Sequence, residues 1–180
     1  MTPEQLRKWV AAGESETQEF KRSTGQRREA AKTLCAMLNH RGGRVLFGVE
    51  PDGRAAGQTV SDDTMRHVAE ELARIDPTVL PEVERVPVAD GREVVVVTVE
   101  AGRNVPYTYD GKAFRRVAST NTTMSRDEFN RMLLDRRHGE RRWETEPLDG
   151  WTAADLDIAE IDRTVDEAVR LGRLAAPQTR

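Results

Sequence analysis

Apolar residues recur along this chain at two different spacings, and each spacing predicts a different kind of element. In several segments the apolar positions lie three or four residues apart, which is typical of helices that bury one face. The clearest is residues 27–39, where alanine, leucine and methionine fill one face and basic side chains the other. The predicted helices are 3–12, 27–39, 61–75, 125–137 and 155–171.

Other segments alternate apolar and polar residues or carry an unbroken apolar run, as β-strands do. The run Val94–Val99 is apolar on both faces, which predicts a strand in the middle of a sheet. Asp90-Gly91 and Asp110-Gly111 each separate two such segments, and this dipeptide favours the tight turn of a β-hairpin. The predicted strands are 16–22, 44–50, a return strand at 54–57, 82–89, 92–100 and the two arms of a hairpin within 105–117.

Charge is distributed unevenly, although the 180 residues carry a formal net charge of only −3. Residues 21–44 contain seven basic side chains against Glu29 alone. Most basic residues of the chain are arginines, whose planar guanidinium group suits phosphate. Residues 141–180 are acidic instead. The local excess predicts a nucleic-acid-binding face, and a solvated helix face is the alternative interpretation.

The chain shows no sign of a membrane or secreted context. No apolar run approaches the roughly 20 residues that a membrane-spanning helix needs. The first residues lack the apolar centre of a signal peptide, and Cys35 is the only cysteine, so no internal disulfide can form. We therefore expect a cytoplasmic protein with no membrane partner.

Two motifs, at residues 14–21 and 39–49, carry a family resemblance together with later segments. The first reads Glu-x-x-x-x-Glu-Phe-Lys, and the second joins a helix-ending asparagine to Gly-Gly and a strand that ends in Gly-Val. With a later Pro-Tyr and an Arg-x-x-Ser-x-Asn sequence, they resemble the Schlafen AlbA-type domain, also called the AlbA_2 or divergent AAA-4 domain. The matching positions are Glu14, Glu19, Phe20, Lys21, Asn39, Gly42, Gly43, Gly48, Val49, Gly53, Gly57, Pro106, Tyr107, Arg116, Ser119 and Asn121.

The resemblance covers about residues 10–137 and implies the fold class: a mixed α/β domain with a mixed central sheet flanked by helices, followed here by a C-terminal helical segment. We therefore predict a nucleic-acid-binding domain at 1–137, then a linker and acidic helix at 138–180. The tail resembles the segment that follows this domain in bacterial RecG-like helicases and transcriptional regulators. The residues of that likeness are Arg142-Trp143-Glu144, Pro147, Asp155-Leu156-Asp157 and Gly172-Arg173-Leu174.

In the Schlafen branch the resemblance implies a metal-dependent RNase that cuts tRNA or rRNA with three acidic residues. Glu14 and Glu19 match the first two acids in spacing. The third position departs, because a gapless match places Pro51 there, so either Glu50 or Asp52 could take the role. Mg²⁺ or Mn²⁺ held by Glu14, Glu19 and one of these two acids would activate water at the scissile phosphate.

Lys21 matches a lysine of the RNase branch that could contact this phosphate. On a strand, Lys21 and Glu19 would project from one face while Phe20 points into the core on the other. A structural interpretation remains beside the catalytic one, in which Glu19 and Lys21 form a pair that braces the fold.

Phosphate contacts are expected from basic and hydroxyl-bearing side chains, which fix a nucleic acid without reading its sequence. Residues 119–123 add hydroxyl groups directly before the helix at 125–137, with an ordinary loop as the alternative. The predicted nucleic-acid contacts are Lys21, Arg22, Arg27, Arg28, Arg41, Arg44, Arg115, Arg116, Ser119 and Asn121.

The pair Gly42-Gly43 predicts a helix end and a tight turn, with close approach of the backbone to a phosphate as the alternative. The chain has no Gly-x-x-x-x-Gly-Lys-Ser/Thr motif, so no ATP-binding loop of that type is expected.

Three functions are consistent with these patterns. The first is a nucleic-acid-binding domain for RNA or DNA, and the second adds metal-dependent endoribonuclease activity on structured RNA such as tRNA. The third is a DNA-binding, regulatory or oligomerisation module of a RecG-like helicase or transcriptional regulator, without catalysis. A homo-oligomer, with a dimer as the simplest case, is left open.

Overall fold

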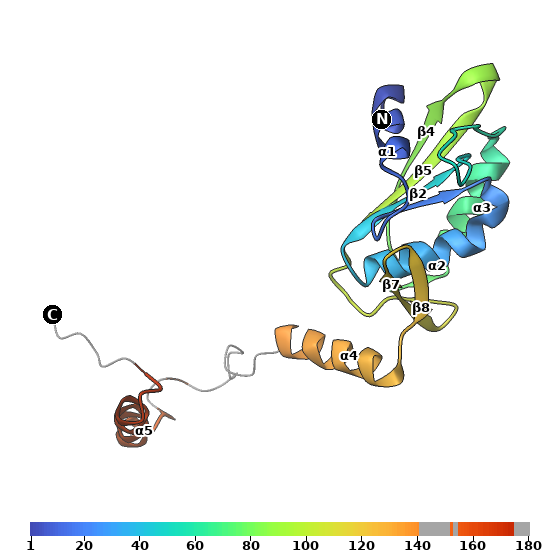
Figure 1. The fold of residues 1–180 in the computed structure, drawn as a ribbon. Helices are drawn as coiled ribbons and strands as arrows, with labels where there is room; N and C mark the ends of the chain where they lie inside the picture. Colours follow the sequence, from blue (N-terminus) through green and yellow to red (C-terminus); the bar gives the residue numbers. More distant parts are fainter. Residues whose placement is uncertain (141–151, 153–154, 175–180) are drawn as a thin grey trace. The chain divides into compact units, whose positions relative to one another are not determined.

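The computed structural model describes residues 1–140, 152 and 155–174. Contacts between Cα atoms divide the chain into two compact units, residues 1–140 and 141–180. The first unit contains both sheets and four α-helices, and the second contains one α-helix among its described residues (Figure 1). Each unit is described by itself.

A mixed four-stranded sheet forms the centre of the first unit, in the order β1-β2-β5-β4. β1 runs parallel to β2, whereas β5 runs antiparallel to both of its neighbours. This arrangement confirms the predicted fold class and the central place of the Val94–Val99 run. The strands are β1 (Gln18–Lys21), β2 (Gly42–Phe47), β4 (Glu82–Pro87) and β5 (Glu93–Glu100).

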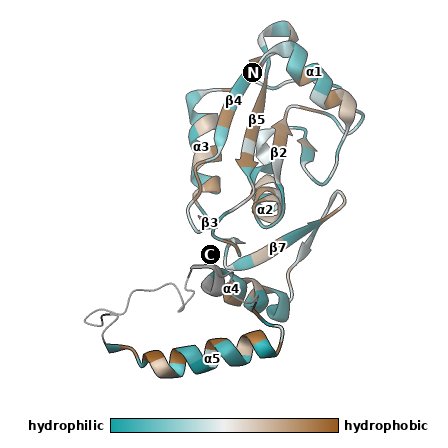
Figure 2. Ribbon diagram, turned by 90° about the vertical axis from the view of Figure 1, so that its left-hand side faces the viewer, coloured by the Kyte–Doolittle hydropathy of each residue, from teal (hydrophilic) through white to brown (hydrophobic). Residues whose placement is uncertain are grey.

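Helices cover both faces of this sheet (Figure 1). α1 (Pro3–Ala12) lies on one face, and α2 (Arg27–Leu38) and α3 (Asp62–Leu72) lie on the other. The capping residues Thr2 and Ser61 accept hydrogen bonds from the first turns of α1 and α3, which explains where these helices begin. Figure 2 shows brown, apolar residues concentrated on β2, β5 and α2, where the layers meet.

A second sheet, in the order β3-β6-β7-β8, packs on the far side of α2, so that α2 lies between the two sheets. Its strands are β3 (Ile75–Asp76), β6 (Thr108–Tyr109), β7 (Lys112–Val117) and β8 (Thr120–Thr123). Two 3₁₀ turns, Thr24–Gln26 and Ala89–Gly91, and the helix α4 (Arg126–Glu140) complete the unit.

Two expectations from the sequence are corrected here. Residues 54–57 form no strand, and an isolated β-bridge joins the following residue, Gln58, to Glu93. For residues 119–123 an ordinary loop is the sequence-based alternative to phosphate contacts. These residues instead contain the strand β8, which pairs with β7. Both hairpin turns are confirmed, because Asp90-Gly91 and Asp110-Gly111 all have positive φ.

The second unit contains α5 (Ile158–Arg170), within the predicted helix at 155–171. Asp157 caps it by accepting from the Glu160 N–H, and Gly172 ends it with a φ of +69°. Brown and teal residues alternate along α5 in Figure 2, as expected for an amphipathic helix. No helix in the described part of the chain is both long and apolar enough to span a membrane.

The buried thiol of Cys35 gives the first unit a predicted sensitivity to alkali. Cys35 is 0% exposed, and burial raises the pKa of its thiol to about 12. In the unfolded chain the thiol ionises near its ordinary pKa of 9. The contribution of the neutral thiol to the free energy of unfolding is therefore fully present below pH 9 and is lost as the pH rises toward 12. At pH 10.5 the expected loss from this group is about 2 kcal/mol.

Urea unfolding of the protein and of Cys35→Ala between pH 8 and pH 11 measures this loss. The variant is expected to start less stable but to decline less steeply with pH, because it has no thiol to ionise. Parallel declines for the two proteins would contradict the prediction.

Candidate functional site

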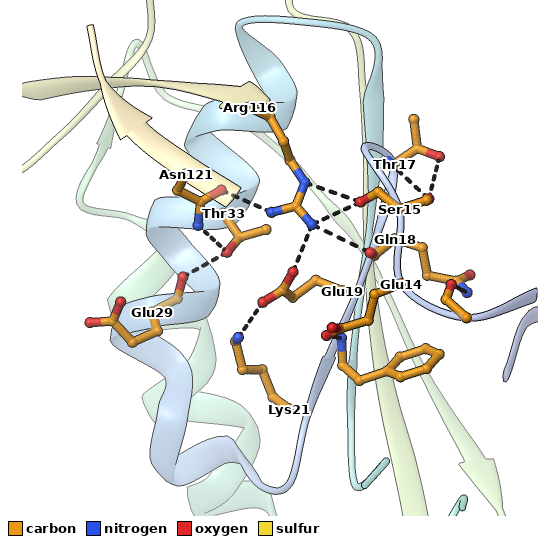
Figure 3. A network of polar contacts seen from close by, with 12 residues as sticks. Glu14, Ser15, Thr17, Gln18, Glu19, Lys21, Glu29, Thr33, Arg116 and Asn121 are labelled. Atoms are coloured by element: carbon orange, nitrogen blue, oxygen red, sulfur yellow. Dashed lines mark hydrogen bonds and ion pairs between the residues drawn. The ribbon is translucent and has the colours of Figure 1, made fainter. Parts of the chain in front are cut away.

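The alternation of β1 separates its side chains between the two faces of the first sheet. Phe20 packs in the core under α1, with Leu46 and Val96. Glu19 and Lys21 point to the opposite face, toward α2 (Figure 3). The predicted same-face placement of Glu19 and Lys21 is therefore confirmed.

Glu19 lies between two cations. Its Oε1 accepts from Lys21 Nζ at 2.5 Å, and its Oε2 accepts from Arg116 Nη2 at 2.6 Å (Figure 3). The Arg116 side chain is 0% exposed, and those of Glu19 and Lys21 are 11% and 13% exposed. A buried carboxylate needs such partners, because an unpaired charge in this environment is costly.

Arg116 also binds the chain before β1. Its Nη2 donates to the Ser15 carbonyl at 2.8 Å and to the Gln18 carbonyl at 3.4 Å, and its Nε donates to Ser15 at 3.2 Å. Its Nη1 donates to Asn121 Oδ1 at 2.9 Å, and Asn121 Nδ2 donates to the Thr33 hydroxyl at 2.7 Å. We call Glu19, Lys21, Arg116, Asn121 and Thr33 the clasp, because they join β1, α2 and the β7–β8 hairpin.

The clasp uses the polar side-chain groups of Arg116 and Asn121, two of the predicted nucleic-acid contacts, within the protein, which favours a structural role for both. All three nitrogens of the Arg116 guanidinium group donate inside the protein, and both polar atoms of the Asn121 side chain are used. Arg116 is 4% exposed and Asn121 is half-buried, and their role as nucleic-acid contacts stays a prediction. For Glu19 and Lys21 the geometry agrees with the structural interpretation.

The other predicted acids also have partners within the protein. Glu14 Oε1 accepts from the Phe20 N–H at 2.9 Å. Glu50 pairs with Arg22 at 3.1 Å, and Asp52 accepts from the Arg54 N–H at 3.0 Å.

Two small pockets are lined in part by the predicted site residues. A pocket of about 390 Å³ is lined by Glu14, Glu19, Lys21, Arg22 and other residues. A neighbouring pocket of about 330 Å³ is lined by Glu14 and Asp52 among others, whereas Glu50 lines neither of the two. Glu14 and Glu19 therefore line one pocket, whereas neither Glu50 nor Asp52 lines it with them.

A shared Mg²⁺ or Mn²⁺ does not fit this arrangement. Among the described residues no three of His, Cys, Asp and Glu lie together as a group that could hold a metal ion. Both oxygens of Glu19 already face cations. Such a metal needs several oxygen ligands at about 2.0–2.6 Å. The predicted three-acid site is not assembled, and metal-dependent cleavage stays a prediction from the resemblance.

The predicted basic face is divided between several places. Arg28 lies in the first turn of α2, and the Arg22 N–H donates to the side chain of Gln26, the residue just before α2. Arg41 and Arg44 lie beyond the C-terminal end of α2. A helix of 12 residues is about 18 Å long, so these pairs are well separated. Arg44 faces α1, on the opposite face of the sheet from α2, because its guanidinium group stacks on Trp9.

Of the other predicted contacts, Arg27 pairs with Glu71 at 3.8 Å. Arg115 pairs with Glu128 of α4 at 3.7 Å, and Ser119 is exposed in the turn between β7 and β8. Arg28 is exposed and makes no ion pair or side-chain hydrogen bond with the described residues.

Sequence reasoning missed Thr33 and the Ser15 carbonyl as parts of the clasp. Thr33 carried a signal, because it is a polar residue inside the most apolar part of α2 and is fully buried. The Ser15 carbonyl carried none, because every residue has a carbonyl and this one meets a side chain 101 positions away.

Comparisons with known proteins now add to this geometry. The family model described as Schlafen, AlbA_2 matches residues 14–125, which include all five residues of the clasp. A search of curated proteins found no match.

Two solved structures share the fold. The DIP2311 protein from Corynebacterium diphtheriae aligns with a TM-score of 0.50 and 21% identity over 86% of this chain and 34% of its own. The N-terminal domain of a putative ATP-dependent DNA helicase RecG-related protein from Nitrosomonas europaea aligns with a TM-score of 0.50 and 20% identity, over 69% of this chain and 94% of that domain. The chain thus spans about a third of the length of the Corynebacterium protein.

Proposed function

Because the chain belongs to the Schlafen AlbA_2 family, we propose that it binds nucleic acid by holding phosphates with arginine side chains at the N-terminal end of α2. The observation that carries this proposal is the pair Arg22 and Arg28. The Arg22 side chain is 68% exposed and lines the pocket beside Lys21, and Arg28 is exposed with no partner among the described residues.

Three features of this end of α2 favour an anion. Guanidinium groups bind phosphate oxygens with two N–H donors at once. The amide groups of a helix N-terminus add a partial positive charge. The ion pair between Arg22 and Glu50 is exposed on the Arg22 side, and such pairs contribute little, so a phosphate can compete for Arg22.

The proposal is for binding without a metal ion. Each predicted acid already holds a partner in the protein, so no cleavage step is derived from them. Phosphate contacts of this kind do not read sequence, so RNA and DNA of different sequences are expected to bind with similar affinity.

Arg22→Ala/Arg28→Ala is expected to weaken binding to a labelled RNA hairpin and a labelled DNA duplex, and to flatten its salt dependence. The slope of log K against log salt for the duplex should fall by about 1 for each arginine, about 2 in all. Fluorescence anisotropy between 50 and 300 mM KCl measures both quantities.

Arg92→Ala/Arg103→Ala is the matched control, because both residues are exposed, lie outside α2 and the turn before it, and have no partner among the described residues. It removes the same charge and should leave the slope unchanged. Equal effects of the two variants would contradict the proposed site, because they would mean that the nucleic acid is held only by general charge attraction. No affinity for either nucleic acid would overturn it and favour the regulatory module. Running the bound RNA on a gel after incubation with Mn²⁺ separates binding from cleavage.

A further inference from the structure

Arg44 occupies an unusual place on the face of the first sheet that α1 covers. It stands near the start of β2, between Gln18 of β1 and Thr98 of β5. Its guanidinium carbon lies 3.8 Å from the centroid of the Trp9 ring on α1. This cation–π contact restricts the position of the guanidinium group.

The guanidinium group of Arg44 has no acceptor in the described structure. It makes no hydrogen bond or ion pair with the described residues, and its Nε is buried without a partner. The surrounding protein lowers the pKa of Arg44, because burial disfavours its charged form. Buried or half-buried arginines are usually paired, as Arg116 is in the clasp. Arg44 therefore offers donors that the fold does not use.

The neighbours of Arg44 leave this position open to an anion. The Gln18 amide is already used, since Nε2 donates to the carbonyls of Trp9 and Gly13 at 2.6 and 2.7 Å. The Thr98 hydroxyl, directly opposite Arg44 on β5, makes no hydrogen bond with the described residues. Directly opposite side chains have Cβ atoms about 5 Å apart, so Thr98 and Arg44 can reach one ligand. Glu82 of β4 lies directly opposite Thr98 in the sheet. It forms no ion pair with Arg44 or with any other described residue, so it does not neutralise the guanidinium group.

We propose that Arg44, stacked on Trp9 and flanked by Thr98, is a binding site for a phosphate group on the α1 face of the sheet. The guanidinium fork can bind two phosphate oxygens, and the Thr98 hydroxyl can donate to a third. Because the contact with Trp9 already restricts the Arg44 side chain, less side-chain freedom is lost on binding. The site does not depend on the function proposed for Arg22 and Arg28, which lie at the α2 end.

The indole N–H resonance of Trp9 reports directly on this site in ¹H–¹⁵N NMR spectra of the full chain. The sequence contains three tryptophans, and Trp9→Phe assigns the resonance. Inorganic phosphate, ribose 5-phosphate and a ten-nucleotide oligothymidylate are titrated at constant ionic strength, with acetate as the control anion. We expect a saturable shift with a phosphate-bearing probe that is at least about tenfold weaker in Arg44→Lys, which keeps the charge but loses the fork.

The probes distinguish the source of the phosphate. Saturation by inorganic phosphate or ribose 5-phosphate indicates a free phosphate ligand, whereas saturation by the oligonucleotide alone indicates a backbone phosphate. In Arg22→Ala/Arg28→Ala the Trp9 shift is expected to persist, so the two proposals can fail separately. Equal response to acetate, no saturable shift, or an unchanged response in a folded Arg44→Lys protein would overturn the site. Circular dichroism and thermal unfolding establish that the variant is folded.

Discussion

Arg116→Met is expected to lower the free energy of unfolding by about 3–5 kcal/mol, the usual effect of removing one partner of a buried ion pair. Methionine can fill much of the space but has no donor. The substitution leaves the Glu19 carboxylate with Lys21 alone and removes the donors to the Ser15 and Gln18 carbonyls. Urea unfolding followed by circular dichroism measures the loss.

The adjacent residue provides a matched control. Arg115 lies on the same strand, but its side chain is 49% exposed and its ion pair with Glu128 is 3.7 Å long. Arg115→Met should therefore change stability by less than about 1 kcal/mol. If Arg116→Met were as mild as Arg115→Met, the clasp would not hold the fold and the prediction would be contradicted.

The clasp also affects how activity assays on this chain are interpreted. Glu19 is the acid that a nuclease hypothesis would remove first, yet here it holds Lys21 and Arg116 together. A Glu19→Gln protein that loses activity could have lost its fold instead of a reacting group. Activity data for this position are informative only beside an unfolding measurement on the same protein.

Local patterns predicted the elements well where one physical rule decided them. The apolar stripe of α2 and the unbroken run of β5 were placed correctly, because burial alone requires these patterns. The two Asp-Gly turns were also correct, because tight hairpins need positive φ at both positions. β8 was missed because its residues Thr120–Thr123 are polar, and only pairing with β7 makes them a strand.

The arrangement of the site could not be predicted in the same way. The count of basic residues in 21–44 treats them as neighbours, but α2 separates them by its length and the sheet places Arg44 on the opposite face. Glu14 and Glu19, two of the three acids predicted to share a metal ion, line one pocket. What the sequence did not reveal is that Arg116, 97 positions away from Glu19, would neutralise it.

Gly42-Gly43 is another place where the sequence pattern was noticed but its structural reason was not predicted. The sequence predicted a helix end and a tight turn, whereas both glycines belong to β2. Gly42 pairs with Glu100 of β5, and a Cβ atom on Gly42 would lie 2.6 Å from the Val99 carbonyl oxygen and 2.7 Å from the Ala101 nitrogen. Its φ is +74°. The close approach is therefore to the protein's own backbone.

Gly42→Ala is accordingly expected to destabilise the first unit by about 3–5 kcal/mol, through unfavourable positive φ together with a clash against backbone that cannot move aside. Gly111 separates these two causes, because its φ is +70° but nothing lies within 4 Å of an added Cβ. Gly111→Ala should lose only about 1–2 kcal/mol from the backbone conformation. The difference between the two variants in urea unfolding measures the contact between β2 and β5. Equal losses would mean that positive φ alone requires glycine at position 42 and that the strands tolerate a side chain between them.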